Sequence, residues 1–225
     1  MNRRANSLRA QAMKYSITWF DFLICMVLFI GLLRGKKRGM SEELLSLIQW
    51  ICIVFVAGKI YEPFSIFISA QLRISALFAN MTAYLLVVIG IKFLFLAVKK
   101  FAGEKLTGSD VFGPLEYYLG MLAGMLRWFC MFFVGLCLFN SRLVTDAELA
   151  ALVKQDKDVY GSSFFPRYGT IQRDIFKQSY SGPMIQTNLG FLMIKQAPYE
   201  DLMAKRVEVG RQRERDLNEL IDKKR

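Results

Sequence analysis

Long apolar stretches are the feature that most restricts how this chain can fold. Residues 17–33 contain one charged side chain, Asp21, and residues 41–58, 78–98 and 113–139 are similarly apolar. A helix needs about 20 such residues to cross the hydrocarbon core of a bilayer. Backbone polar groups in lipid must be bonded within the protein, which favours helices over open strands. The sequence therefore predicts an all-α integral membrane protein with four spanning helices packed as a bundle.

Composition agrees with a membrane protein and narrows its chemistry. Hydrophobic residues make up 54% of the chain, above the roughly 45–50% typical of soluble domains. The net charge of +11 then favours anionic lipid headgroups over nucleic acid as the partner. The four cysteines lie in apolar stretches without metal-binding spacing, and histidine is absent, which removes imidazole catalysis and most zinc sites. We predict a protein that is not an enzyme and has no cofactor.

The chain divides into four predicted parts. They are a basic N-terminal tail at residues 1–15, the four-helix domain at 16–139, a membrane-proximal helical segment at 140–198, and a charged tail at 199–225. The last part carries charges of both signs with a broken apolar pattern, which predicts a frayed helix or disorder.

The membrane-proximal segment contains an amphipathic stretch. Between Phe164 and Phe176 apolar side chains recur with helical spacing, while Arg167, Arg173 and Lys177 take the other positions. Such a pattern is typical of a helix that lies on a membrane surface. Packing on the rim of the bundle is the alternative.

Charged and small residues inside the predicted spans bear on helix packing. Asp21, Lys92 and Arg127 are costly in lipid, so we expect them to face protein or to extend to the interface. Lys92 is near enough to the end of its span to reach the headgroups. Gly120 and Gly124 lie on one helix face and permit close backbone approach. That face makes either an intramolecular contact or a homodimer contact.

A basic corner, RGKKRG, separates the first two spans at residues 34–39. Ser41 is a suitable N-cap for the second span, and two glutamates follow in its first turn, where the helix dipole favours acids. Basic residues near spans favour the cytoplasm, but they are nearly balanced between the two sides of this bundle. We expect both termini in the cytoplasm because the tails carry most of the basic residues.

Several motifs together resemble one family. The segment WFDFLI, the turn LLRGKKRG and the helix start EELLSLIQW resemble the beginning of the colicin V production protein family. Glu116, Gly120, Gly124 and Arg127 match the spacing of that family's last span. This chain departs from the pattern by having Glu116 where Asp is usual and Tyr117 where a basic residue is common. The similarity extends over about residues 17–185.

The resemblance implies a small multi-pass protein of the bacterial inner membrane that is needed for toxin production or export. We therefore expect a non-enzymatic scaffold or assembly factor with an unidentified membrane protein partner, and homo-oligomers are possible. The alternative is a small homo-oligomeric channel or transporter whose polar path is lined by Asp21, Glu116 and Arg127.

The basic corner also allows a specific contact. Alternating crossings put Arg34 and Glu116 at the same membrane face, and both match the family pattern. Arg34 is therefore predicted to pair with Glu116, because a guanidinium can hold a carboxylate with two hydrogen bonds. Lys36, Lys37 and Arg38 would contact lipid phosphates. In the alternative interpretation all four basic residues contact lipid only.

Overall fold

The structure is a computed structural model that describes residues 17–72, 74–106, 113–145, 149–150, 153–154, 168–197 and 210–215. Its helices are α2 (Trp19–Leu72), α3 (Ala76–Leu106), α4 (Glu116–Asn140), α6 (Tyr168–Arg173) and α7 (Ser181–Leu189), with short turns η1 (Gly113–Leu115), η2 (Asp174–Gln178) and η3 (Gly190–Leu192). The described residues contain one isolated extended bridge, between Arg142 and Ala197, and no strand. The predicted helical class is therefore confirmed. The predicted N-terminal tail lies outside the described residues, and of the C-terminal tail only 210–215 are described, as helix.

The basic corner is helical except at Gly39, whereas the sequence predicted two separate helices joined by a turn. α2 runs through 54 residues, and Gly39 is the point inside it where the backbone leaves the helical conformation, with φ 74° and ψ 172°. This region of φ suits glycine because it lacks a Cβ. A straight helix of this length would span about 80 Å at 1.5 Å per residue. The break at Gly39 instead divides α2 into residues 19–38 and 40–72.

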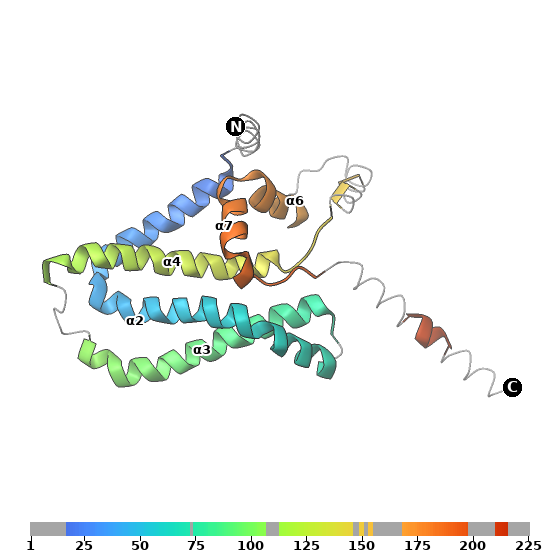
Figure 1. Ribbon diagram of the computed structural model, residues 1–225, viewed down its shortest axis with the longest axis horizontal. Helices are drawn as coiled ribbons and strands as arrows, with labels where there is room; N and C mark the ends of the chain where they lie inside the picture. The colour runs from blue at the N-terminus through green and yellow to red at the C-terminus, as the bar shows by residue number, and fades with distance from the viewer. Residues whose placement is uncertain are drawn as a thin grey trace, which may run out of the picture.

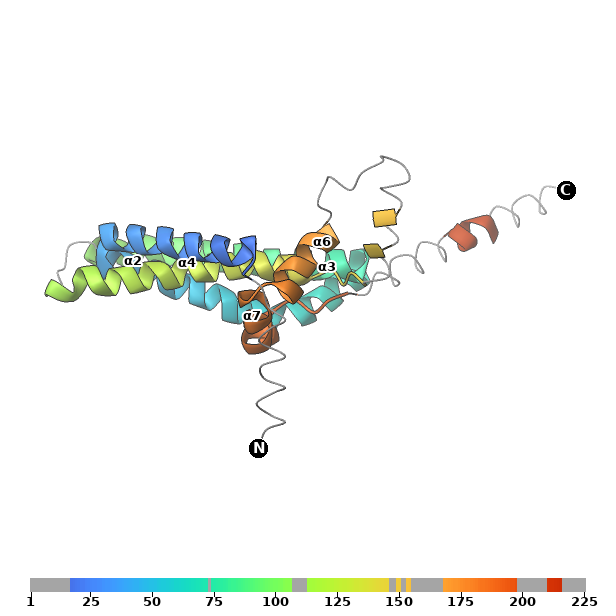
Figure 2. The ribbon, with the colours of Figure 1, turned by 90° about the horizontal axis from the view of Figure 1, so that it is seen from above.

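α2 holds the long helices together. Its two parts lie on either side of the turn at Gly39, and α2 contacts both α4 and α3 (Figures 1 and 2). Phe20 packs on Phe132 of α4 near one end of the helices. Tyr61 packs on Tyr84 of α3 in the second part of α2. The two helices that follow α2 in the chain are therefore organised around it.

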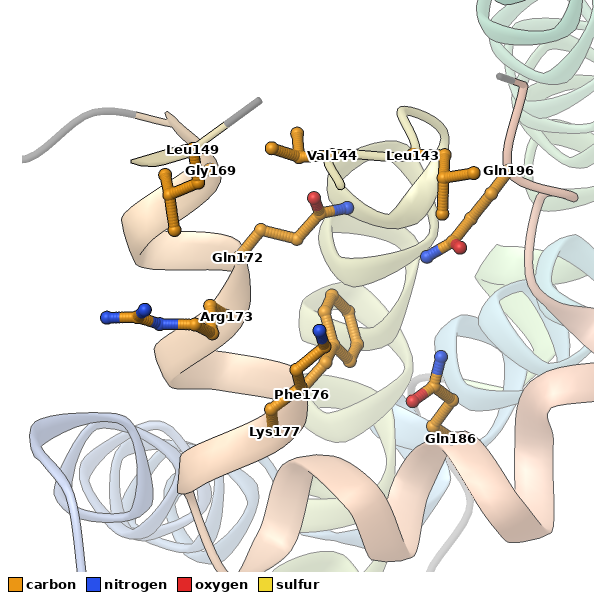
Figure 3. Close-up of a pocket in the computed structure, with 10 residues that line it drawn as sticks. All are labelled: Leu143, Val144, Leu149, Gly169, Gln172, Arg173, Phe176, Lys177, Gln186 and Gln196. Carbon is orange, nitrogen blue, oxygen red and sulfur yellow. The ribbon is translucent and has the colours of Figure 1, made fainter. Parts of the chain in front are cut away.

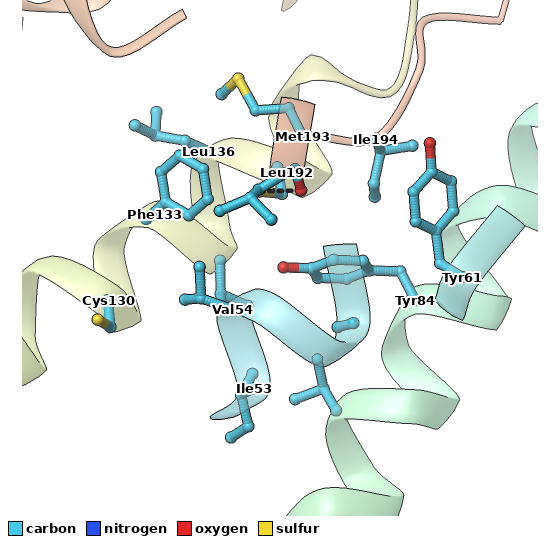
Figure 4. Packing of buried hydrophobic residues seen from close by; sticks show 14 of the residues in the cluster. Ile53, Val54, Tyr61, Tyr84, Cys130, Phe133, Leu136, Leu192, Met193 and Ile194 are labelled. Carbon is cyan, nitrogen blue, oxygen red and sulfur yellow. Dashed lines mark hydrogen bonds between the residues drawn. The ribbon is translucent and has the colours of Figure 1, made fainter. Parts of the chain in front are cut away.

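The hydrophobic core lies where α2, α3, α4 and η3 meet (Figure 4). Tyr84 and Ile53 are fully buried there. η3 and the chain that follows it enter this core with Leu192 and Ile194, which are also buried. The Asn140 side-chain amide donates to the Ile194 carbonyl at 3.1 Å. A late segment of the chain thus completes the core between two early helices.

The outer surfaces of the long helices are apolar. Within the described part of the chain, three helices are long and apolar enough to cross a membrane: Trp19–Leu72, Ala76–Lys100 and Glu116–Asn140. Large side chains such as Phe22, Phe93 and Leu122 are more than half exposed. Contiguous apolar surface of this kind marks contact with a membrane or another protein. These helices fit a membrane protein, and the division of the bundle into four crossings stays a prediction.

The described part of the amphipathic segment packs on the bundle. Ile175 and Phe176 are buried in the core cluster. The Gln172 amide donates to the carbonyls of Phe139 and Arg142, at 3.3 and 2.6 Å, and Tyr168 donates its hydroxyl to the Phe139 carbonyl. These contacts favour rim packing over a helix free to lie on lipid. Residues 164 and 165 lie outside the described part.

Candidate functional site

A buried carboxylate lies close to the turn at Gly39. The Glu43 side chain is fully buried, and its Oε2 lies 2.9 Å from Nη1 of Arg127 on α4. Its Oε1 lies 3.6 Å from Nη1 of Arg38, whose side chain is 45% exposed. Burying a charge among apolar helices costs several kcal/mol unless an opposite charge compensates it. We call Glu43, Arg127 and Arg38 the carboxylate cluster.

The hydrogen bonding of the carboxylate cluster is incomplete. The two carboxylate oxygens of Glu43 and the Nε of Arg127 make no hydrogen bond of good geometry. The Arg127–Glu43 contact nevertheless has the length of a strong ion pair. Attraction between the two charges does not require this alignment. The pair is therefore held mainly by charge, without the two-pronged geometry that an arginine can offer.

Glu116 closes the turn at Gly39. Its Oε1 accepts a hydrogen bond from the Ser41 backbone N–H at 2.7 Å. A Cβ placed on Gly39 would lie 2.7 Å from the same oxygen. Both this close approach and the positive φ therefore require glycine. The carboxylate satisfies one of the amides that a helix start leaves unpaired. Glu116 thereby joins the start of α4 to the second part of α2.

Arg34 and Glu116, the predicted ion pair, have different partners in the structure. Arg34 lies over the Trp128 ring, with its guanidinium carbon 5.9 Å from the ring centre. The ion pairs among the described residues are Arg38–Glu43, Arg127–Glu43 and Lys195–Glu62. The structure therefore does not bring the predicted pair together. Glu116 Oε1 is bonded to the Ser41 amide, and the Arg34 guanidinium lies against the Trp128 ring instead.

The small-residue face of α4 contacts the first part of α2. A Cβ on Gly120 would lie 2.7 Å from the Gly35 carbonyl oxygen, and a Cβ on Gly31 would lie 2.9 Å from the Gly124 carbonyl oxygen. Side chains at these positions would force the two backbones apart. Gly120 and Gly124 thus lie in an intramolecular crossing in this structure.

Two lysines of α3, Lys92 and Lys99, contact α2. The Lys99 ammonium donates to the Ser46 hydroxyl at 3.1 Å. Lys92 lies over the Trp50 ring, 4.8 Å from its centre, where an ammonium is attracted to the aromatic face. The two lysines contact successive turns of one α2 face, next to Glu43.

Asp21 fixes the C-terminal part of the chain to the start of α2. Its carboxylate accepts hydrogen bonds from the backbone amides of Ser181 at 2.9 Å and Tyr180 at 3.3 Å, and from the Ser181 hydroxyl. An acid at a helix start bonds its unpaired amides and suits its dipole. Asp21 therefore orients α7 against α2.

The remaining residues of the basic corner face outward. Lys36 and Lys37 are exposed, next to Arg38 of the carboxylate cluster. Their predicted contact with lipid phosphates stays a prediction. Their position at the turn between the two parts of α2 is compatible with it.

A polar cavity lies on the opposite end of the bundle, between α6, α7 and the segment after α4 (Figure 3). Its volume is about 160 Å³, and Gln172, Gln186 and Gln196 line it. Gln196 donates to the Asn140 side-chain carbonyl at 3.0 Å. Burial raises the pKa of the neighbouring Tyr168, which keeps its hydroxyl as a donor. These hydrogen bonds belong to the contacts that hold the segments after α4 against the rim of the bundle.

A second cavity of about 480 Å³ lies between the end of α2 and the start of α3, beside Lys195 and Glu62. The Lys195 ammonium lies 2.6 Å from the Glu62 carboxylate. This hydrogen bond raises the pKa of Lys195. Both side chains are at least half exposed, so the pair contributes little to stability.

Glu43 is the residue that sequence reasoning missed. The sequence predicts for it only the role of an acid in the first turn of a helix, where the helix dipole favours negative charge. The signal that identifies it is its spacing, because Glu43, Leu47 and Val54 share one helical face and all three are buried. An acid on such a face, together with an unexplained Arg127 in another span, predicts an ion pair.

Long apolar helices joined by an ion pair closed off from solvent fit the class of helical membrane proteins. The described residues hold no group of His, Cys, Asp and Glu side chains that could bind a metal ion. The chain belongs to the colicin V production protein family, whose model matches residues 20–156. The resemblance in the sequence is thereby confirmed. Searches of the curated proteins and of the solved structures each found no significant match.

Proposed function

We propose that this chain is a non-enzymatic membrane scaffold or export factor for toxin production, located in the bacterial inner membrane. One observation carries the proposal: the charged groups of the spans join elements to one another. Arg127 forms an ion pair with Glu43, Glu116 accepts a hydrogen bond from the Ser41 amide, and Asp21 accepts one from the Ser181 amide. Charges used in this way fix a shape. Family membership supports a role in toxin production.

The proposed scaffold crosses the membrane four times. The first part of α2 has about the length of one crossing, at 1.5 Å per residue. The break at Gly39 lets residues 40–72 return across the bilayer. Counting the two parts of α2 separately, with α3 and α4, gives the four-helix bundle that we propose.

The channel hypothesis is less well supported. Asp21 lies at the start of α2, beside α7, whereas Glu116 lies at the turn at Gly39 at the other end of the first part of α2. Asp21, Glu116 and Arg127 each have a different partner. The three side chains therefore do not line one continuous polar path. A pore within one copy is therefore disfavoured.

Complementation tests the proposal. In a colicin V producer that lacks its own family member, the full chain should restore toxin activity in the medium. The same protein reconstituted into liposomes should leave ion flux at the level of empty liposomes. Flux that is abolished by Arg127→Gln, with no restoration of toxin, would reject the scaffold in favour of the channel.

A further inference from the structure

The surroundings of Glu43 carry more positive than negative charge. Arg38 lies on α2, Arg127 on α4 and Lys99 on α3. Both arginines lie within 4 Å of the Glu43 carboxylate, and Lys99 is within electrostatic range of it. Lys92 lies within electrostatic range of Lys99 as well. Glu43 can neutralise only one of these cations, and the Glu116 carboxylate at the same turn is bonded to the Ser41 amide. An excess of like charge at partly desolvated positions is unfavourable unless a further anion compensates it.

Two of the cations are open to the outside. Arg127 is almost completely buried, so its charge is committed to Glu43. Arg38 is about half exposed, and its 3.6 Å contact with Glu43 leaves its other N–H groups available. Lys99 is partly exposed, and among the described residues its ammonium is bonded to the uncharged Ser46 hydroxyl. The excess charge therefore lies on Arg38 and Lys99.

Both open cations lie at the end of an apolar segment. Arg38 immediately precedes the break at Gly39, and Lys99 is the second-last residue of the apolar part of α3. Glu43 and Ser46, on adjacent turns of α2, hold the two side chains to the same region. Residues at such positions meet the phosphates of a bilayer. A guanidinium and an ammonium together are the usual protein partners of a phosphate group.

We propose that Arg38 and Lys99 form a binding site for a phosphate group, with the Glu43–Arg127 ion pair as its buried base. Arg38 supplies two N–H donors, and Lys99 supplies a point charge. Glu43 orients Arg38, and Arg127 offsets the negative charge of Glu43, which would otherwise repel the ligand. The phosphate belongs either to an anionic phospholipid or to a free phosphate compound. This site goes beyond the proposed scaffold function and does not depend on it.

Lipid titration of the purified full chain tests the site. Phosphatidylglycerol is added to the protein in a neutral detergent, and bound lipid is counted by native mass spectrometry. Arg38→Gln and Lys99→Gln should each weaken binding about fivefold, the effect of one basic residue at an anionic surface. Lys99→Arg should retain binding. The matched control Lys100→Gln changes the exposed neighbour of Lys99 on the same helix and should leave binding within twofold.

Separate arms distinguish the sources of the phosphate. If phosphatidylglycerol raises the melting temperature and excess inorganic phosphate does not, the ligand is a lipid. If inorganic phosphate alone raises it and displaces the lipid, the ligand is a free phosphate compound. Either result supports the site when Lys99→Gln removes it.

The proposal is overturned if Lys100→Gln weakens binding as much as the two site variants, because the attraction would then be a general effect of basic residues at this end of the helices. It is also overturned if neither ligand stabilises the wild-type protein. Circular dichroism without ligand checks folding. Lys99→Gln alone decides the outcome if Arg38→Gln does not fold, since Lys99 has no contact with Glu43 in the described ion pairs.

Discussion

At the scale of single residues, charge is used inside this protein to fix neighbours. Glu43 is fully buried beside Arg127, and Asp21 bonds to a residue 160 positions away in the chain. Glu43 compensates the guanidinium charge of Arg127 on α4, and Asp21 accepts hydrogen bonds from the first amides of α7. Removing one partner therefore costs more than the interaction itself contributes, because a buried charge is left alone.

Glu43→Gln should destabilise the protein by about 3–5 kcal/mol, the range for breaking a buried ion pair from one side. The measurement is the free energy of unfolding from denaturant titration in detergent micelles. Glu42→Gln is the matched control, since Glu42 is an exposed neighbour, and it should change stability by less than about 0.5 kcal/mol. Combining Glu43→Gln with Arg127→Met should recover part of the loss. Equal effects of the two single changes at 42 and 43 would show that Glu43 is not buried with Arg127.

At the scale of elements, the crossing between the first part of α2 and α4 depends on the absence of side chains. Glycines from both helices put backbone against backbone, and Gly120 lies against Gly35. In lipid this close packing supplies most of the attraction between helices, because apolar side chains gain little by leaving lipid tails. α3 offers an internal comparison, since a Cβ on its Gly90 would meet no atom within 4 Å.

Gly120→Ala should therefore destabilise the protein by about 1–3 kcal/mol, the usual cost of overpacking. Gly90→Ala should leave stability unchanged or raise it by up to about 1 kcal/mol, because alanine is the better helix former. Thermal unfolding of both variants in the same detergent, followed by circular dichroism, provides the comparison. A loss at Gly90 equal to that at Gly120 would indicate that helix propensity, and not the crossing, determines the result.

At the scale of the whole molecule, the sequence predicted what depends on local pattern. The apolar helices and the small-residue face on α4 follow from composition and spacing, and the family match is confirmed. The partners of the charges depend on which helices become neighbours, and no local pattern contains that information. Arg34 therefore lies against Trp128 instead of Glu116, and the insertion of Leu192 into the core could not be predicted.

The arrangement of crossings gives the last prediction. The first part of α2 separates the turn at Gly39 from the end where Asp21 holds α7, so one crossing puts these two ends at opposite membrane faces. In a background without the four native cysteines, Lys36→Cys and Asn188→Cys introduce exposed thiols at the two ends. With both termini in the cytoplasm, an impermeant reagent applied to intact cells should label position 36 and spare position 188, and lysis should expose both. Labelling of 188 alone would reverse the orientation, and labelling of both positions in intact cells would show that the first part of α2 does not cross the membrane.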